Sequence, residues 1–170
     1  GTAINSGNGN VRVISHQQPQ EIYLNQIIAG TGSVSLVAGR IFDNNGDANN
    51  VTAKNLRVET NSIGEGVFSP VETNVDTIAA IANLTFSIIE ADDVTVDSTG
   101  DISVQRVNFG GATSTETDLS LSDVVGGMVE LVALDGNITI NEGDLDDTGI
   151  LADVHAVLVS EGMGSSIIVN

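Results

Sequence analysis

The residues of this chain that could do chemistry are its carboxylates and its two histidines, His16 and His155. A nucleophilic triad needs a base within hydrogen-bond reach of a Ser or Cys, yet the histidines have no spaced partners and no Gly-x-Ser-x-Gly motif is present. Zinc has no ligand set either, because the chain has no cysteine and only these two isolated histidines. We therefore expect neither histidine-based catalysis nor a zinc site.

Paired carboxylates could instead cleave a polysaccharide, a reaction that needs two acids about 5 to 10 Å apart over a sugar-binding cleft. Acidic residues form three clusters: Asp92–Asp93, Asp97 with Asp101, and Asp144–Asp147. Asp92 and Asp93 are adjacent, so on a strand their side chains would point to opposite faces. The chain offers few aromatic platforms for a sugar, and Arg106 is the only basic residue near the acids. A polysaccharide lyase or hydrolase is therefore the weakest alternative, and we expect no enzyme.

Calcium is the one cofactor that the sequence suggests. The segment from Asp43 to Asn50 offers side-chain oxygens at alternating positions around Gly46, and hard cations prefer such ligands. The candidate ligands are Asp43, Asn45 and Asp47. The segment lacks the downstream Glu of an EF-hand loop, and Asn and Asp at a corner can serve turn geometry alone. The alternatives are therefore a calcium-binding corner and a plain turn.

The charge balance limits the partners. Five basic residues face 23 acidic ones, a net charge of −18, which excludes a nucleic-acid backbone and argues against an anionic membrane surface. Such a surface suits a secreted protein, or one whose carboxylates are neutralised by divalent cations or salt. No apolar stretch approaches the roughly 18 to 20 residues of a spanning helix, so we expect no membrane insertion. Residues 1–15 lack the basic and apolar regions of a signal peptide, so any such signal would lie elsewhere.

The elements that must position these residues are short strands. Runs of five to seven residues alternate apolar and polar side chains and are broken by Gly, Asn and Asp, and the chain contains 21 Val, 17 Ile and 14 Thr. Strands this short can stack as successive rungs, each burying its inner face against the next. We therefore expect an all-β fold, a right-handed parallel β-helix (a β-solenoid) of roughly eight to ten turns. A β-sandwich is the alternative.

The alternation predicts the following rungs: Val11–Ser15, Glu21–Ile28, Ser33–Val37, Asn50–Thr52, Asn55–Glu59, Ala82–Ile89, Val94–Asp97, Asp101–Val107, Leu119–Leu121, Met128–Leu134, Asn137–Asn141, Val154–Val159 and Ser166–Val169. Val75–Leu84 could form one short helix or a further rung. The expected core ladder consists of Val34, Leu36, Leu56, Val58, Val94, Val96, Ile102, Val104, Ile138 and Ile140. Residues 110–117 are small and polar, which predicts a protruding loop.

The chain contains an internal echo. Gly9–Val13 resembles Gly136–Ile140, and Ile27–Val37 resembles Leu158–Ile168, at offsets that nearly agree. We therefore interpret residues 1–170 as a single solenoid segment, slightly more than one long repeat of a tandem array. Chance similarity between segments rich in Gly and Val is the competing explanation.

One stretch also resembles a known family. Gly32–Gly39, Asp43–Asn50, Val51–Leu56 and Val71–Ala80 occur in the order typical of the repeats of giant secreted filamentous-haemagglutinin-like bacterial adhesins. The similarity is clearest over residues 32–97. It implies a right-handed parallel β-helix, a secreted or cell-surface location on a bacterium, and a role as an adhesin shaft. The apolar run Phe86–Ala91 and the lack of an N-terminal secretion domain depart from the family pattern.

The function expected from the sequence is therefore structural: a segment of a large secreted or cell-surface fibre or adhesin that projects or polymerises, with a role in adhesion or biofilm. The expected partners are neighbouring repeats or copies stacked end to end, and a host or matrix glycan. The last apolar run, Ser166–Asn170, is expected to stack on another segment. The alternative is a module that binds a glycan or receptor through the loop at 110–117.

Overall fold

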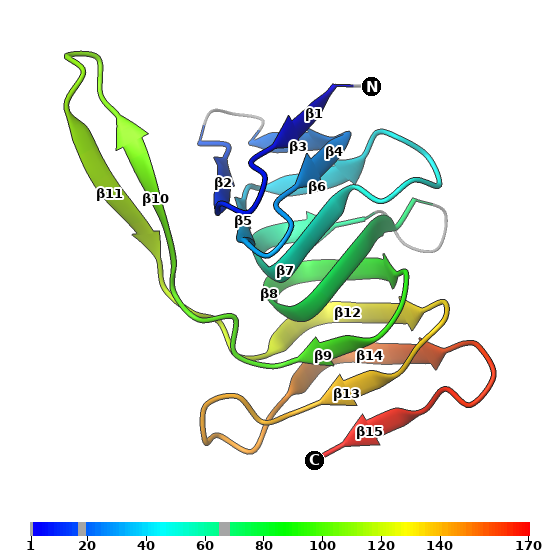
Figure 1. Cartoon of the computed structure of the whole chain (residues 1–170). Coiled ribbons are helices and arrows are strands. Elements are labelled where there is room, and N and C mark those ends of the chain that lie inside the picture. Colours follow the sequence, from blue (N-terminus) through cyan, green and yellow to red (C-terminus); the bar gives the residue numbers. More distant parts are fainter. Residues whose placement is uncertain (1, 17–19, 65–68) are drawn as a thin grey trace.

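The computed structural model describes residues 2–16, 20–64 and 69–170, and every regular element in them is a β-strand (Figure 1). The strands stack along one axis, with the two chain ends at opposite ends of the stack. All pairs in the main thirteen-stranded sheet are parallel. The predicted all-β parallel β-helix is therefore confirmed.

Fifteen strands are present in the described residues. Their bounds are β1 Ala3–Asn5, β2 Val11–Ile14, β3 Glu21–Leu24, β4 Gln26–Ile28, β5 Ser33–Val37, β6 Arg40–Asp43, β7 Val51–Ile63, β8 Val71–Glu90, β9 Val94–Val96, β10 Ile102–Val107, β11 Thr113–Asp118, β12 Val124–Ala133, β13 Ile138–Ile140, β14 Ile150–Ser160 and β15 Ile167–Val169.

The pairing arranges these strands in three faces around the axis. The first face stacks β1, β4 and the starts of β7 and β8, and it continues through β9, β13 and β15. Strand β9 pairs with Thr77 and Ile78 of β8, where that strand passes into the second face. The second face stacks β2, β5, the middle of β7, the middle of β8, and the starts of β12 and β14. The third face stacks β3, β6, and the ends of β7, β8, β12 and β14. The long strands therefore turn a corner between the second and third faces.

The first face has seven rungs, so the solenoid makes about seven turns rather than the eight to ten expected. Each turn is longer than the sequence pattern suggested, because it contains three strands. Val34 pairs with Leu56 and Leu56 with Ile78, a repeat of 22 residues. The two segments expected to mark a longer repeat meet on one ladder, which runs from Val11 through Val34, Leu56, Ile78 and Val96 to Ile140. The sequence similarity aligns Val11 with Ile138 instead, two residues away, and the longer repeat stays a prediction. A Gly-Asn pair before a strand favours a turn at any corner, so it can recur without a longer repeat.

Continuous strands pass the corner between the second and third faces with a shift of register. The shift lies between Thr60 and Ser62 in β7 and between Gly126 and Met128 in β12. A side chain at Gly127 would place its Cβ 2.7 Å from the carbonyl oxygen of Leu84 in the rung above. Glycine is therefore required there by the close approach of two backbones.

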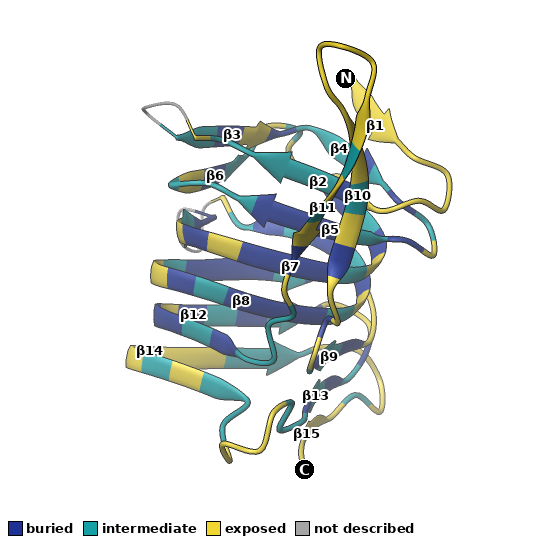
Figure 2. Cartoon of the chain, turned by 90° about the vertical axis from the view of Figure 1, so that its left-hand side faces the viewer, coloured by how far each residue is buried: buried dark blue, intermediate teal, exposed yellow. Residues whose placement is uncertain are grey.

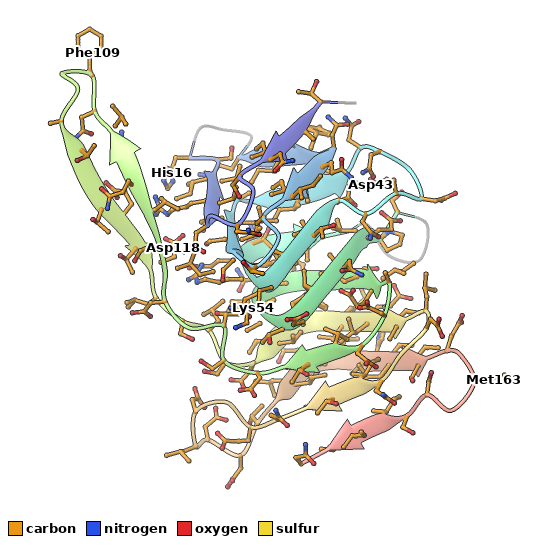
Figure 3. All side chains as sticks on the ribbon, in the orientation of Figure 1. His16, Asp43, Lys54, Phe109, Asp118 and Met163 are labelled. Atoms are coloured by element: carbon orange, nitrogen blue, oxygen red, sulfur yellow. The ribbon has the colours of Figure 1, made fainter. Side chains whose placement is uncertain are left out.

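One element departs from the stack. Strands β10 and β11 form an antiparallel hairpin that leaves the solenoid between β9 and β12 and extends toward the N-terminal end (Figures 1 and 2). Phe109, at its tip, lies beyond the first rungs (Figure 3). The run at 101–107 is thus a strand but no rung, and Leu119–Leu121 is no strand. Residues 113–117, expected as part of a loop, form β11, because polar side chains suit a strand exposed on its outer face.

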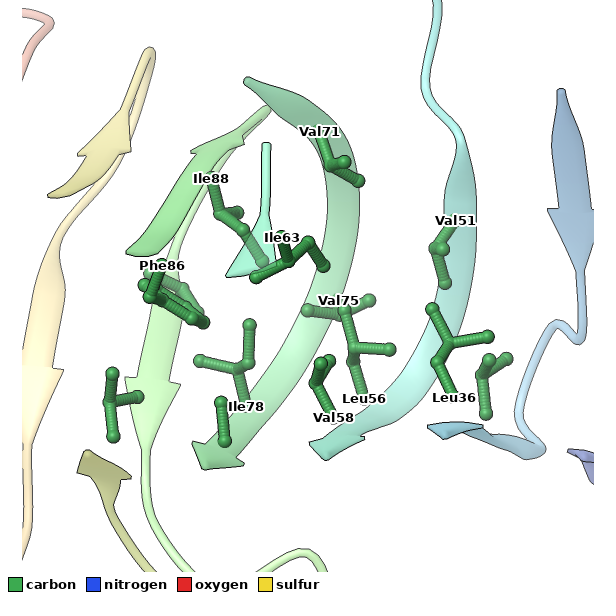
Figure 4. Packing of buried hydrophobic residues seen from close by; sticks show 14 of the residues in the cluster. Leu36, Val51, Leu56, Val58, Ile63, Val71, Val75, Ile78, Phe86 and Ile88 are labelled. Carbon is green, nitrogen blue, oxygen red and sulfur yellow. The ribbon is translucent and has the colours of Figure 1, made fainter. Parts of the chain in front are cut away.

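The core lies inside the three faces and follows the expected alternation (Figure 4). The inward residues of the middle turns are fully buried, whereas β14 and the hairpin are largely exposed (Figure 2). The expected core residues that are buried are Val34, Leu36, Leu56, Val58, Val94, Val96, Ile102, Ile138 and Ile140. Val104 is the exception, because it lies in the hairpin and is only half-buried. Val75–Leu84, expected as a helix or a rung, is strand within β8.

The difference between Ile140 and Val104 is testable. Ile140→Asp should greatly lower the melting temperature or prevent folding, because an unpaired carboxylate in the stack costs several kcal/mol. Val104→Asp should change the melting temperature little, because its side chain borders a groove open to solvent. Circular dichroism melts of the two variants measure this, and equal destabilisation by both would contradict the assignment of the core.

Candidate functional site

The two histidines lie at opposite ends of the solenoid. His16 follows β2 in the first turn, and His155 lies in β14 in the last. The adjacent acids Asp92 and Asp93 bind different rungs. Asp92 accepts a hydrogen bond from the Asn74 side chain at 3.1 Å, and Asp93 accepts the backbone N–H of Asn137 at 2.6 Å. This carboxylate pair therefore joins successive turns of the first face.

The candidate calcium corner is built around a buried asparagine. Asn50 donates through Nδ2 to Asp43 Oδ1 and to Asn45 Oδ1, both at 2.9 Å. Asp43 also accepts the backbone N–H groups of Asn45 at 2.8 Å and of Gly46 at 3.2 Å. The structure thus brings Asp43 and Asn45 together, while Asp47 is exposed and takes no part in these hydrogen bonds. The oxygens serve the turn, and calcium binding here remains a prediction.

A third acid lies near this corner, and the sequence spacing did not reveal it. Glu72, in the next rung, has one carboxylate oxygen, Oε2, that is buried without a hydrogen-bond partner. Burial raises the pKa of Glu72, and the nearby carboxylates of Asp43 and Asp47 raise it further. If the corner binds calcium, Glu72 is the residue that would supply the carboxylate missing from the linear motif.

A second acidic site forms where the loop between β13 and β14 meets the start of β12. The carboxylate oxygens of Asp123, Asp144 and Asp146 lie within 4.8 Å of one another. Asp123 Oδ1 is buried without a hydrogen-bond partner. Burial raises the pKa of Asp123 to about 6, and the charges of Asp144, Asp146 and Glu142 contribute. We call these four residues the acidic corner; its carboxylates are ligands of the kind that a divalent cation prefers.

Sequence reasoning noted Asp144–Asp147 as an acidic cluster but missed its partner Asp123, about twenty residues earlier. The two segments meet because Val124 pairs with Ile150, so the residues before each strand share one corner. Glu142 shapes the loop, since its Oε1 accepts the backbone N–H groups of Asp144 and Asp146 at 2.9 and 2.8 Å. Only the register of the strands could have revealed the site.

The third candidate is the base of the hairpin. Arg12 donates to both oxygens of Asp118 at 2.8 Å, and Ser35 donates to the same carboxylate at 2.7 Å. These hydrogen bonds and the charge of Arg12 lower the pKa of Asp118. Arg57 donates to the carbonyl oxygen of Leu119 at 2.7 Å, and Asn10 donates to that of Ser103 at 3.0 Å. The hairpin is therefore fixed to the second face by an ion pair and by hydrogen bonds.

Above this anchor, the hairpin and β2 enclose a groove of about 380 Å³. Its lining residues are Arg12, Ile14, His16, Val104, Arg106 and Glu116. Two of the five basic residues of the chain and one of its two histidines thus line one groove. Arg106 is 67% exposed and lies 4.0 Å from Glu116, at the limit of an ion pair. The groove suits a ligand that carries negative charge.

No protein-family model, curated protein or solved structure matches the chain. The resemblance to adhesin repeats therefore remains a prediction from the sequence. Among the described residues, no helix is long and apolar enough to cross a membrane.

One buried carboxyl group lies inside the solenoid itself. Glu90, at the end of β8, is fully buried and accepts hydrogen bonds from Thr73 Oγ1 at 2.6 Å, from Val75 N at 3.1 Å and from Ala91 N at 3.0 Å. Burial raises the pKa of Glu90 to about 7, although these three donors oppose the shift, and the charge of Asp92 adds to it slightly. The ordinary pKa of Glu applies in the unfolded chain.

The stability of the fold should therefore depend on Glu90 and pH. Between about pH 4.5 and 7 the folded state holds a proton that the unfolded state releases, so stability falls as the pH rises through this window. The loss approaches about 3 kcal/mol above pH 7. Glu90→Gln should reduce this pH dependence and be more stable than wild type at pH 8. Urea unfolding at several pH values measures it, with the exposed Asp76→Asn as control, and an unchanged slope in Glu90→Gln would refute the assignment.

Calcium binding can be tested at both acidic sites together. If either binds the ion, calcium should stabilise the fold by mass action, by about 2.7 kcal/mol at a hundredfold excess over the dissociation constant. Asp43→Ala with Asp47→Ala removes one set of ligands, and Asp144→Ala with Asp146→Ala removes the other. The pair that abolishes the rise in melting temperature identifies the site. Equal melting of the wild type in calcium and in chelator would show that both corners are turns only.

Proposed function

We propose that the chain is a structural segment of a large secreted or cell-surface fibre or adhesin, a shaft that projects an adhesive end or polymerises. The observation that supports this most is the parallel ladder, which continues through seven rungs on the first face. Rungs are bonded to their neighbours on three faces, so a pull along the axis is shared by several backbone hydrogen bonds in each turn. Such a rod resists extension and bending.

The last turn supports stacking as the mode of assembly. Ile138 pairs with Ile167 and Ile140 with Val169, so β13 and β15 hold equivalent positions on the first face. Ile140 is 6% exposed, whereas Val169 is 73% exposed, because β13 has a rung on both sides and β15 on one. A further rung, from a neighbouring repeat or copy, would cover these apolar side chains.

The secreted or cell-surface location and the adhesion or biofilm role rest on two features of the sequence. The order of motifs over residues 32–97 resembles bacterial adhesin repeats. The net charge of −18 keeps an extended rod soluble and limits lateral aggregation through mutual repulsion. Both features agree with a shaft outside the cell.

A second candidate function is binding of a host or matrix glycan, or of a receptor, by the hairpin. Phe109 is fully exposed at its tip (Figure 3). The outward face of the hairpin carries paired polar side chains, with Ser103 bonded to Thr117 at 2.7 Å and Gln105 bonded to Thr115 at 2.8 Å. An aromatic ring at the tip, with hydroxyl and amide groups farther along the hairpin, offers both stacking and hydrogen bonds to a sugar.

The shaft function can be tested with concatemers of two and three copies, joined by a flexible linker as long as one turn. If the copies stack coaxially, each added copy should lengthen the particle by about 34 Å, the height of seven rungs at ~4.8 Å each. Small-angle X-ray scattering measures the maximum dimension and the stiffness. Val169→Lys at each junction, which places a charge at the inward position that pairs with Ile140, should turn the rod into flexibly linked beads. Wild-type concatemers that already scatter as flexible beads would overturn the shaft.

A further inference from the structure

Charge is distributed unevenly along the solenoid axis. Residues 1–60 contain four basic and four acidic residues, whereas residues 119–170, which follow the hairpin, contain nine acidic residues and no Lys or Arg. The first turns are therefore neutral overall, and the last turns carry negative charge alone. Two C-terminal ends would repel each other, but the N-terminal end of one copy is compatible with the C-terminal end of another.

The hairpin and the loop at 141–149, which we call the acidic loop, leave the solenoid at the same corner in successive turns. The hairpin connects β9 on the first face to β12 on the second, and the loop at 141–149 connects β13 to β14. Strands β9 and β13 are paired neighbours, and so are β12 and β14. Both insertions therefore lie on one side of the rod, as Figure 1 shows.

The hairpin extends beyond the first rung of the second face. Its base is fixed beside β2 through Arg12 and Asp118, and its outer half passes the level of β2, with Phe109 farthest out (Figures 2 and 3). In a head-to-tail stack, the start of β14 of the preceding copy would lie above β2. The overhanging half of the hairpin would then lie beside the loop that precedes β14.

We propose that the hairpin is an intermolecular clasp: the groove lined by Arg12, His16 and Arg106 binds the acidic loop at 141–149 of a second copy, in a head-to-tail array. The loop carries Glu142, Asp144, Asp146 and Asp147, four carboxylates within six residues. The exposed guanidinium of Arg106, held only at 4.0 Å from Glu116, is available to them. Arg12 uses Nε and Nη2 on Asp118, so its Nη1 has no protein partner among the described residues.

The clasp rests on the proposed shaft function but adds something that backbone stacking does not provide. Backbone hydrogen bonds do not distinguish one side chain from another, so an exposed strand edge can pair with a neighbouring edge in more than one register. An ionic contact at a single corner selects one rotation, and with it one register of the array. It also sets polarity, since the first turns hold the groove and the last turns hold the loop.

Charge reversal tests the clasp, with sedimentation equilibrium of separate chains at about 20 mM salt, where screening is weak. Arg106→Glu should weaken self-association at least tenfold. Asp144→Lys with Asp147→Lys should do the same, and all three substitutions in one chain should restore most of the affinity. The side chains of Asp144 and Asp147 form none of the hydrogen bonds that shape the loop. Asp147 has a φ of 64°, which Lys adopts less readily than Asp, so thermal melts are needed to check that the variants fold.

The matched control is Asp135→Lys with Asp153→Lys, which makes the same charge change in the last turns outside the loop. General repulsion predicts that both lysine pairs strengthen association, because each lowers the net negative charge. The clasp predicts that only the control pair does so. If Val169→Lys abolishes association but the Arg106 and loop variants leave it unchanged, the clasp is overturned while the shaft stands. Wild-type chains that do not associate would also overturn it, and the concatemers would still decide the shaft.

Discussion

The structure depends on the requirement that the backbone groups of each turn find their partners in the next turn at the same register. Leu56 pairs with Val34 on one side and with Ile78 on the other, and all three side chains are fully buried. The constraint fixes the length of a turn and keeps the inward positions in line. Changes in loop length are therefore possible only at corners, where the chain leaves the ladder.

The corners satisfy this requirement with polar side chains that bond along the axis. Asn50 is fully buried, and both polar atoms of its side chain form hydrogen bonds. Its Nδ2 donates to the carbonyl oxygen of Leu24 at 3.0 Å, and its Oδ1 accepts the backbone N–H of Glu72 at 3.0 Å. Glu90 does the same for the turn that contains Thr73 and Val75. Buried polar groups of this kind are tolerated because the regular rungs place a partner within reach.

The sequence predicted the features that depend on period-two alternation and on turn-forming residues. It did not predict the features that depend on which strands are neighbours and in which register they pair. Period-two alternation identified β5, whose bounds Ser33–Val37 were predicted without error, together with the inward residues from Val34 to Ile140. The same alternation placed Val104 in the core, because it cannot distinguish a rung from a hairpin that leaves the stack. The meeting of Asp123 with Asp144 depends on which strands are neighbours, and local pattern carries no information about that.

The hairpin is inserted without disturbing the ladder around it. Val94 and Ile138 are paired although 44 residues separate them, twice the ordinary turn, and the rungs on either side keep their register. The scaffold thus tolerates additional sequence at this corner at no cost to its own hydrogen bonds. Such a rod can acquire new appendages during evolution, or by design, while its pitch and rigidity are inherited unchanged.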